Sequence, residues 1–499
     1  MAPASKPRFD LAAASNALFA TRRAQFGWFL ILATISRISV FGDTNYFNDE
    51  YFYFQAGLRR HDGELPYVDV WDRKGPGLFL TYWLTGFFSR SVIAYQAAAL
   101  LAAAATAYLA NRIAGRFTSR IGAMLGGSLY LVLLVFFGGG GGQSPVFYNL
   151  ATALAALIVV EALPRLRRGE VPLSLYGAMA AAGFAITFKQ TAICESLFLG
   201  LFVLWQLRHR PLPCLAAIAL GLIAAGAAPM ALFAALYALA GHFSEFWHAM
   251  VTANLAKAYN PANDMARRIA VLTMLMSPAL LPALAGILIR DDSPDAPRAF
   301  LIGWLLAAMA GVAMVPNFYE HYLLPLCLPV SVAAARALGY RRIGPIYGYA
   351  AVLFLLLLGP GLDFKQRAAS REAMAATLAD IRSSSPQPRL LVYEGPVDLY
   401  RQIGRYPPTP LYYPLHLYFP AEHNVSHVAT ADAVSRMIAW RPTAVVTYHD
   451  YPRREENQAS ALLVHGYIAK NCQLKATRRL PEVYASHLAD IWLCAESTR

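Results

Sequence analysis

Residues 214–240 read CLAAIALGLIAAGAAPMALFAALYALA and contain no charged side chain. Folded as a helix, such a run is long enough to cross the roughly 30 Å of hydrocarbon in a bilayer. Comparable runs lie at residues 91–110, 269–289 and 322–338, and further apolar stretches are shorter. Of the 499 residues, 57% are hydrophobic and 15% are charged, which is far from the balance of a soluble protein. We therefore predict a polytopic α-helical membrane protein.

The orientation in the membrane follows from the basic residues, because Lys and Arg near helix ends are retained on the cytoplasmic side. The first apolar run, 26–41, has no clear cleavage site after it, so we interpret it as an uncleaved helix. With a cytoplasmic N-terminus, that segment and the inner turns hold 17 Lys and Arg, and the outer segments hold 9. We expect about 11 spans in the cell inner membrane. The net charge of +13 then reflects this bias and contact with anionic lipid, and nothing indicates nucleic acid binding.

Two outer segments are too long to be simple turns. The first loop, defined here as residues 42–90, is rich in aromatic residues, which suit the headgroup zone. Within it, residues 57–67 are predicted to form a turn, and the apolar stretch 77–88 is too short to span and is expected at the interface. The second long loop, about 241–268, is expected to be mobile over the same outer surface.

The composition changes after residue 360, and we predict two domains. Residues 1–360 form the transmembrane module, and residues 361–499 form an extracytoplasmic α/β domain with ordinary soluble charge density. Within the second part, residues 389–393 and 443–448 are predicted strands, and residues 397–403 and 431–440 are predicted helices. Cys472 and Cys494 lie in this domain, where a disulfide is permitted, but spacing alone leaves their pairing open.

Two common site signatures are missing from the sequence. The glycine run 138–142 lacks a Walker lysine, so we interpret it as a flexible outer turn rather than a phosphate-binding loop. No His and Cys cluster has the spacing of a zinc site. The ionisable residues at the outer membrane face are therefore the candidates for chemistry.

Asp49 and Glu50 are adjacent acids a few residues beyond the first membrane helix. Acids in this position are often only solvated, or they cap the next helix. If the segment is helical, neighbouring side chains point about 100° apart, so the two acids cannot share one role. One would then face a substrate, and the other would support it.

Several basic and polar residues are predicted at the same outer level. Arg73 and Lys74 could be lipid anchors, and Lys189, which interrupts an apolar stretch, could extend to the interface. An ionisable residue near membrane depth is, however, a functional candidate by default. Glu320 and His321 begin another span and could contact a bound head group.

Together these residues resemble a known family. The segments NDEYFYFQAGL (48–58), PYVD (66–69) and DRKGP (72–76) resemble the first loop of the GT-C glycosyltransferases. The match is to the branch with the protein O-mannosyltransferases and the bacterial aminoarabinose transferases, although Gly75 replaces the first proline of their Asp-x-Lys-Pro-Pro pattern. The resemblance extends to the turn at Lys189 and to residues 321–325 and 400–409, and so covers most of the chain.

The resemblance implies a GT-C-like fold and the transfer of a sugar from a polyprenyl-phosphate donor to a hydroxyl or amine. It implies a lipid, glycan or protein acceptor in the cell envelope. Direct attack with one base would invert the anomeric centre, but two carboxylates alone leave retention open, since retaining enzymes also use two. Asp49 would be the base and Glu50 its neighbour with a supporting role. Lys74, Lys189, Arg73 and His321 would bind the donor phosphate. The residues predicted to support the acceptor or the loop are Tyr51, Tyr67, Asp69, Asp72, Glu320 and Tyr322.

No cofactor is required by the sequence, although Asp49 with His321 or Glu320 could hold a divalent metal ion. The main alternative is a transporter or flippase for a lipid-linked or amphiphilic solute, which would explain the spans and Lys189. It would not need the α/β domain or an acidic first loop. A non-catalytic assembly factor is a further alternative, and it would not need the acids. The sugar, the acceptor and the oligomeric state are left open.

Overall fold

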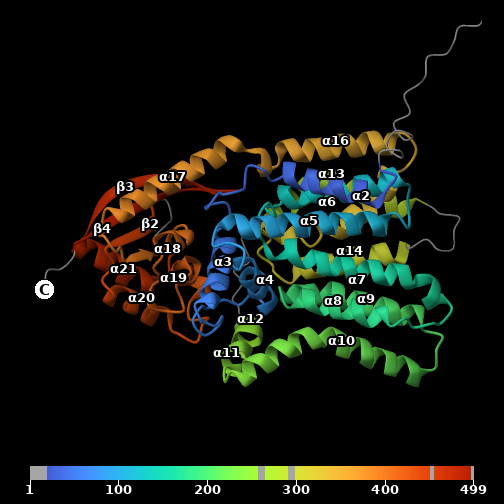
Figure 1. Cartoon of the computed structure of the whole chain (residues 1–499), viewed down its shortest axis with the longest axis horizontal. Helices are drawn as coiled ribbons and strands as arrows, with labels where there is room; N and C mark the ends of the chain where they lie inside the picture. The colour runs from blue at the N-terminus through green and yellow to red at the C-terminus, as the bar shows by residue number, and fades with distance from the viewer. Residues whose placement is uncertain (1–18, 257–264, 290–297, 450–454, 496–499) are drawn as a thin grey trace, which may run out of the picture.

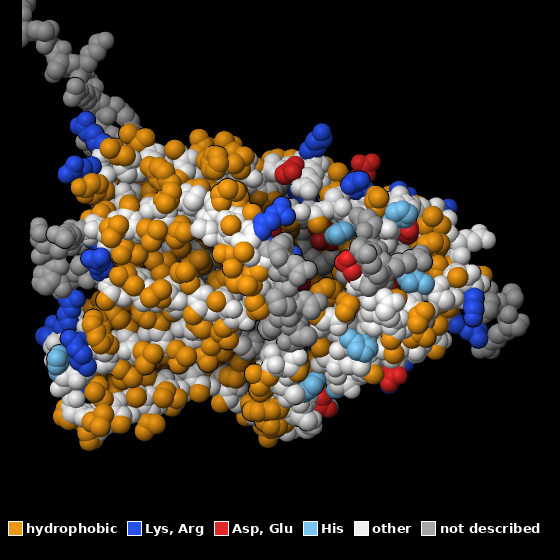
Figure 2. Space-filling view, turned by 180° about the vertical axis from the view of Figure 1, so that it is seen from behind, with side chains coloured by type: hydrophobic (Ala, Val, Ile, Leu, Met, Phe, Trp, Pro, Cys, Tyr) orange, Lys and Arg blue, Asp and Glu red, His pale blue; other side chains and the backbone are white. Residues whose placement is uncertain are grey.

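The computed structural model describes residues 19–256, 265–289, 298–449 and 455–495. A bundle of membrane helices forms one end of the molecule and an α/β part forms the other, with the short helices α3 and α4 between them (Figure 1). The surface of the helical part seen in Figure 2 is largely hydrophobic, and Lys and Arg side chains gather at the end far from the α/β part. The chain is an integral membrane protein.

In the described part of the chain, four helices are long and apolar enough to cross a membrane: α5 (Val92–Ala114), α7 (Ser144–Arg167), α10 (Leu212–Leu239) and α13 (Met265–Leu288). The shorter apolar helices are α6 (Arg120–Phe136), α8 (Ser174–Ile186), α9 (Ile193–Gln206), α14 (Arg298–Ala313), α15 (Cys327–Leu338) and α16 (Ile343–Leu358). With α2 (Arg22–Ile35) they lie side by side with the long ones (Figure 1). The number of about 11 spans stays a prediction.

The predicted helix over 322–338 is wrong in its first part. Residues Glu320–Leu323 form the 3-10 turn η3, and α15 begins only at Cys327. Pro325 lies between the two, and a proline disfavours helical geometry at the residue before it. This interruption leaves His321 and Tyr322 in a turn.

The first loop contains two helices, α3 (Asn48–His61) and α4 (Pro76–Gly86). The predicted turn therefore starts later than residue 57, because α3 continues through Gly57 to His61. In the second long loop, the chain forms α11 (Phe243–Trp247), the π-helical turn η2 (His248–Thr252) and α12 (Ala253–Leu255). Residues 257–264 of this loop lie outside the described part of the chain, and the expected mobility of the loop 241–268 stays a prediction.

The α/β part contains a four-stranded mixed sheet in the order β1-β2-β4-β3. The predicted strands are confirmed as β1 (Leu390–Val392) and β2 (Ala444–Tyr448), which pair in parallel. The antiparallel hairpin β3 (Cys472–Pro481) and β4 (Ser486–Cys494) completes the sheet. The helices of this part are α17 (Phe364–Arg382), α18 (Asp398–Ile403), α19 (Pro414–Tyr418), α20 (Thr430–Ala439) and α21 (Gln458–Asn471). Two of them, α18 and α20, confirm the predicted helices. Cys472 and Cys494 form a disulfide.

Buried contacts join the α/β part to the first loop. The Arg367 guanidinium on α17 donates to the Asp43 carboxylate at 2.9 Å, and both side chains are fully buried. The Val483 N–H at the tip of the β3–β4 hairpin donates to the Tyr46 carbonyl at 3.0 Å. These two contacts fix the hairpin tip beside the start of α3. The predicted domain boundary at residue 360 stays a prediction.

Candidate active site

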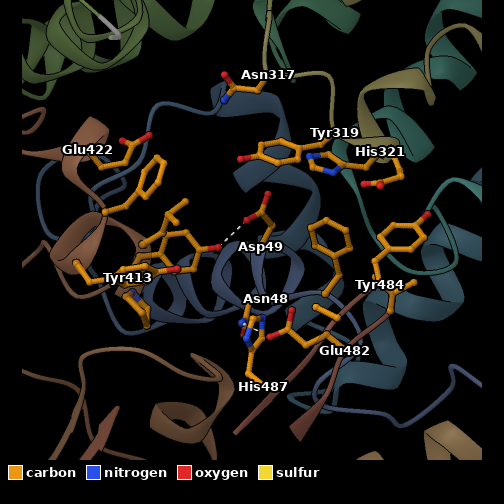
Figure 3. Close-up of a pocket in the computed structure, with 18 of the residues that line it drawn as sticks. Asn48, Asp49, Asn317, Tyr319, His321, Tyr413, Glu422, Glu482, Tyr484 and His487 are labelled. Carbon is orange, nitrogen blue, oxygen red and sulfur yellow. Dashed lines mark hydrogen bonds between the residues drawn. The ribbon is translucent and has the colours of Figure 1, made fainter. Parts of the chain in front are cut away.

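A cavity of about 650 Å³ lies between the helical part and the α/β part. Its walls come from the start of α3, from residues 317–322 and from segments 413–422 and 482–487 (Figure 3). Gly395 and Tyr448, at the carboxyl ends of β1 and β2, also line it. Ligands of α/β sheets commonly bind outside the carboxyl ends of parallel strands. The cavity therefore has the position of a substrate site.

Asp49 lies in the first turn of α3 and faces this cavity. Its Oδ1 accepts a hydrogen bond from the Tyr413 hydroxyl at 2.6 Å, and its Oδ2 accepts one from the Tyr53 hydroxyl at 3.0 Å. Lys74 Nζ lies 4.0 Å from Oδ2. Burial alone would raise the pKa of Asp49, but the charge of Lys74 and the two hydroxyl hydrogen bonds hold that pKa below its ordinary value. Asp49 is thus an ionised carboxylate at neutral pH.

The position of Lys74 is fixed by its own loop. The Asp72 carboxylate accepts the backbone N–H of Lys74 at 3.1 Å, and the Tyr67 hydroxyl donates to the Lys74 carbonyl at 2.8 Å. Tyr67 itself is fully buried and has a positive φ of 72°. Asp69 holds the same turn, since its carboxylate accepts the Leu65 N–H at 2.7 Å. Three of the predicted support residues therefore position Lys74.

The two predicted phosphate-binding lysines come from segments that touch. Gly75 N–H donates to the Phe188 carbonyl at 3.3 Å, and a Cβ on Gly75 would lie 1.9 Å from the Thr187 carbonyl oxygen. Only glycine permits this approach, which accounts for the glycine at residue 75. The contact brings the turn of Lys189 next to Lys74. The Lys189 ammonium lies over the Tyr322 ring, 4.6 Å from its centroid.

His321 lies beside these charges. Its ring packs edge-on against Phe47, at 5.0 Å between centroids. Burial lowers the pKa of His321 to about 3 against the opposite effect of the Asp49 charge, and the charges of Lys189 and Lys74 add to the lowering. His321 is therefore neutral at pH 7 and can offer a ring N–H but no positive charge to a phosphate. Glu320 lines the same wall of the cavity.

Arg73 has a different acidic partner from Lys74. Its guanidinium forms a buried ion pair with Glu422, a residue between α19 and α20. This pair joins the first loop to the α/β part. The role of Arg73 in donor binding stays a prediction.

Glu50 is turned away from the cavity and is fully buried. The glycine run 138–142 forms a turn, as predicted, but a buried one that packs against this carboxyl. A Cβ on Gly141 would lie 1.9 Å from Glu50 Oε2. Burial raises the pKa of Glu50 to about 8, although the N–H groups of Gly142 and Gln143 oppose the shift. Glu50 therefore carries a proton at neutral pH.

Tyr51 also serves the loop rather than the cavity. Its hydroxyl accepts the Tyr46 N–H at 2.7 Å and donates to the Asp43 carbonyl at 2.9 Å. Within the described ranges, no group of three or more His, Cys, Asp or Glu side chains is arranged to hold a metal ion. The possible divalent ion at Asp49 with His321 or Glu320 thus has no preformed third ligand of these types there.

Sequence reasoning missed several cavity residues, notably Tyr413, Arg268 and Glu482, and it also missed the contact of Tyr53 with Asp49. Tyr53 follows Asp49 by four residues, and helical spacing could have indicated their contact. Tyr413 lies 364 residues after Asp49 and carries no local signal. Glu482 accepts a hydrogen bond from Asn48 Nδ2 at 2.9 Å, and burial raises its pKa to about 7.

No protein-family model matches this chain, and no curated protein is similar to it in sequence. Among solved structures, it is similar to ArnT from Cupriavidus metallidurans bound to undecaprenyl phosphate, with 12% identity and a TM-score of 0.56. That match covers 93% of this chain and 98% of ArnT. The apo state of the same ArnT matches over the same shares with 14% identity and a TM-score of 0.40. The predicted resemblance to the GT-C branch of the aminoarabinose transferases is confirmed at the level of the fold.

Proposed function

We propose that this protein is a membrane glycosyltransferase that moves a sugar from a polyprenyl-phosphate donor to a hydroxyl or amine of an acceptor. The observation that carries the proposal is the ionised Asp49 carboxylate at the wall of a large cavity, with Lys74 Nζ 4.0 Å away. The related ArnT fold was crystallised with undecaprenyl phosphate, which supports a donor of that class. The sugar itself is not specified by these features.

In the proposed reaction, Asp49 takes the proton of the acceptor hydroxyl or amine as that group attacks the anomeric carbon. The bond between the anomeric carbon and the phosphate oxygen breaks, and its electron pair leaves with the polyprenyl phosphate. The lysines at 74 and 189 stabilise the added negative charge on this leaving group. Attack from the face opposite the phosphate inverts the anomeric centre, and no covalent intermediate on the protein is needed.

We further propose that the cavity faces the outside of the inner membrane and that the N-terminus is cytoplasmic. The support is the charge pattern, with 17 Lys and Arg in the N-terminus and inner turns against 9 in the outer segments. A donor embedded in the outer leaflet would then present its phosphate at the level of the first loop. The acceptor would be a lipid, glycan or protein of the cell envelope.

The proposal is tested with the full-length protein purified in detergent and radiolabelled polyprenyl-phosphate sugars. Asp49→Asn should lower the rate of donor consumption by about 100- to 10,000-fold, the usual contribution of a general base. Asp62→Asn is the matched control, because Asp62 lies in the same loop but is 53% exposed and pairs only with the exposed Arg90 among the described residues. The anomeric configuration of the product, read by NMR, tests inversion.

Two results would contradict the proposal in different ways. An Asp49→Asn variant that transfers sugar at the wild-type rate would show that Asp49 is not the base. A wild-type protein that consumes none of the donors would contradict the glycosyltransferase activity and favour the transporter or flippase.

A further inference from the structure

The Tyr413 hydroxyl reaches the candidate base from a distant part of the chain. It donates to Asp49 Oδ1 at 2.6 Å, and Tyr413 is only 7% exposed. Tyr413 directly precedes α19, in the α/β part, whereas Asp49 lies on α3. Figure 3 shows the two side chains meeting at the cavity. The contact therefore crosses from one part of the molecule to the other.

The ring of Tyr413 is held in place without its hydroxyl. It stacks on the Phe52 ring, with 4.5 Å between centroids and 20° between planes. His416 packs against its edge at 5.3 Å. The segment is also held three residues before Tyr413, since the backbone N–H of Trp71 donates to the Pro410 carbonyl at 3.0 Å. Removing only the hydroxyl oxygen should therefore leave the segment seated on the first loop.

The two hydrogen bonds on Asp49 fix both of its oxygens. Tyr413 holds Oδ1 and Tyr53 holds Oδ2, so the carboxylate plane is set by one hydroxyl from each part of the molecule. Each oxygen has a second lone pair, which can accept the acceptor's proton. Burial raises the pKa of Tyr413 well above its ordinary value, and the charge of Asp49 adds to this effect, so its hydroxyl stays a donor.

We propose that Tyr413 is a positioning residue for Asp49, and that through it the α/β part completes the active site rather than only covering it. The catalytic half of this statement rests on the proposed function. Tyr413 keeps the base ionised and oriented, because a hydrogen bond to the charged form of a carboxyl favours that form.

Other groups also face Asp49, and a test must separate Tyr413 from them. The neighbouring charged and titratable groups are Tyr53 on α3, Lys74 before α4 and His321 in η3, with Glu50, Tyr82, Glu482 and His416 acting from further away. All of them stay unchanged in Tyr413→Phe. The Tyr467→Phe variant is the matched control, because the Tyr467 hydroxyl is also in the α/β part but bonds the Pro442 carbonyl away from the cavity.

The first measurement is steady-state transfer by wild type, Tyr413→Phe and Tyr467→Phe across pH. Tyr413→Phe should lower kcat by about 10- to 100-fold, the usual worth of a hydrogen bond to a charged group. The KM for the donor should stay within about twofold, since no donor contact is removed. The acid limb of the pH profile should move to higher pH, because Asp49 loses a bond that favours its ionised form. Tyr467→Phe should match wild type in kcat, in the KM for the donor and in the acid limb of the pH profile.

The second measurement needs no transfer activity. Carbodiimides modify protonated carboxyls, so the labelling rate of Asp49 at pH 5 to 6, read by peptide mass spectrometry, reports its protonated fraction. In Tyr413→Phe, the carbodiimide should label Asp49 about tenfold faster if the pKa of Asp49 rises by about one unit. The exposed Asp62 is the internal reference and should label equally in all three proteins.

The outcomes separate this inference from the proposed function. A wild-type labelling rate in Tyr413→Phe overturns the inference, whether or not the protein transfers sugar. Faster labelling with an unchanged kcat also overturns it, because Asp49 would then be held without consequence for the reaction. A wild type that transfers nothing contradicts the proposed function alone, and the labelling rate still decides whether Tyr413 holds Asp49.

Discussion

The cavity face and the glycine-turn face of α3 hold neighbouring carboxylates in opposite environments. Asp49 faces the cavity, accepts two tyrosine hydroxyls and lies 4.0 Å from Lys74 Nζ. Glu50 faces the buried turn at residues 138–142, where the carbonyls of Gly139 and Gly140 accept bonds from Arg37. The pKa of Asp49 is lowered and that of Glu50 is raised to about 8.

We infer from the difference between the two faces that the adjacent acids have different roles. A base must be ionised and reachable, whereas burial in a closed turn favours the protonated form of a carboxyl. The helix separates the two side chains by about 100° and so places them in these two environments. Substitutions on each face test the interpretation that Asp49 is the base and that Glu50 has a supporting role.

The largest effect is expected from removing the cation of the cavity face. Lys74→Met should lower the transfer rate by about 100- to 1,000-fold, because the leaving phosphate loses a preplaced charge. It should also move the acid limb of the pH profile upward, since burial would then raise the pKa of Asp49 without opposition from Lys74. The rate across pH measures both effects. Lys365→Met, on the exposed side of α17, is the control.

Lys74→Arg sharpens this result. It keeps the charge but not the compact ammonium, so it should recover part of the lost rate. If Lys74→Met transferred sugar as fast as wild type, Lys74 would not stabilise the leaving phosphate, and the interpretation as a lipid anchor would be favoured.

A smaller effect is expected from filling the glycine-turn face. Gly141→Ala places a Cβ 1.9 Å from Glu50 Oε2, and overpacking of a buried site costs about 1–3 kcal/mol. Thermal unfolding in detergent should show this loss of stability. Gly466→Ala is the control, because a Cβ there has nothing within 4 Å and alanine favours a helix such as α21.

The cost of Gly141→Ala should fall when Glu50 is shortened. In the Glu50→Ala background the clashing oxygen is gone, so the same substitution should cost less than in wild type. An equal cost in both backgrounds would mean that the turn is strained for a reason unrelated to Glu50.

The sequence alone indicated the parts of this comparison that depend on local chemistry. The uncharged run in α10, the acids at the start of α3 and the strands β1 and β2 all follow from patterns within one segment. The β3 strand was missed because its sequence CQLKATRRLP is polar and largely exposed, so it lacks the apolar alternation of a buried strand.

Contacts between distant segments were beyond such patterns. Five consecutive glycines indicate flexibility, but side chains from distant segments, among them Glu50 and Arg37, pack against that turn and bury it. The Tyr413 hydroxyl on Asp49 has no counterpart in any short motif, because 364 residues separate the pair. The position of Lys189 beside Lys74 likewise depends on the backbone contact at Gly75.

The smallest effect on transfer is expected from Glu50→Gln. At pH 7 the Glu50 carboxyl carries its proton, so a neutral amide of the same shape should leave the transfer rate within about threefold of wild type. A loss as large as that of Asp49→Asn would contradict the comparison, because both acids would then take part in the reaction.

The same variant has a larger effect on the pH dependence of stability. In the folded protein Glu50 keeps its proton up to about pH 8, whereas the unfolded chain releases it near the ordinary value of 4.5. Between these values the folded state binds more protons, so wild-type stability falls as the pH rises. Glu50→Gln lacks this slope, and its stability relative to wild type should increase from pH 5 to pH 8 and then level off. Glu482 titrates in both proteins, so its contribution largely cancels in the difference between their free energies of unfolding. If that difference did not change with pH, the pKa of Glu50 would not be raised.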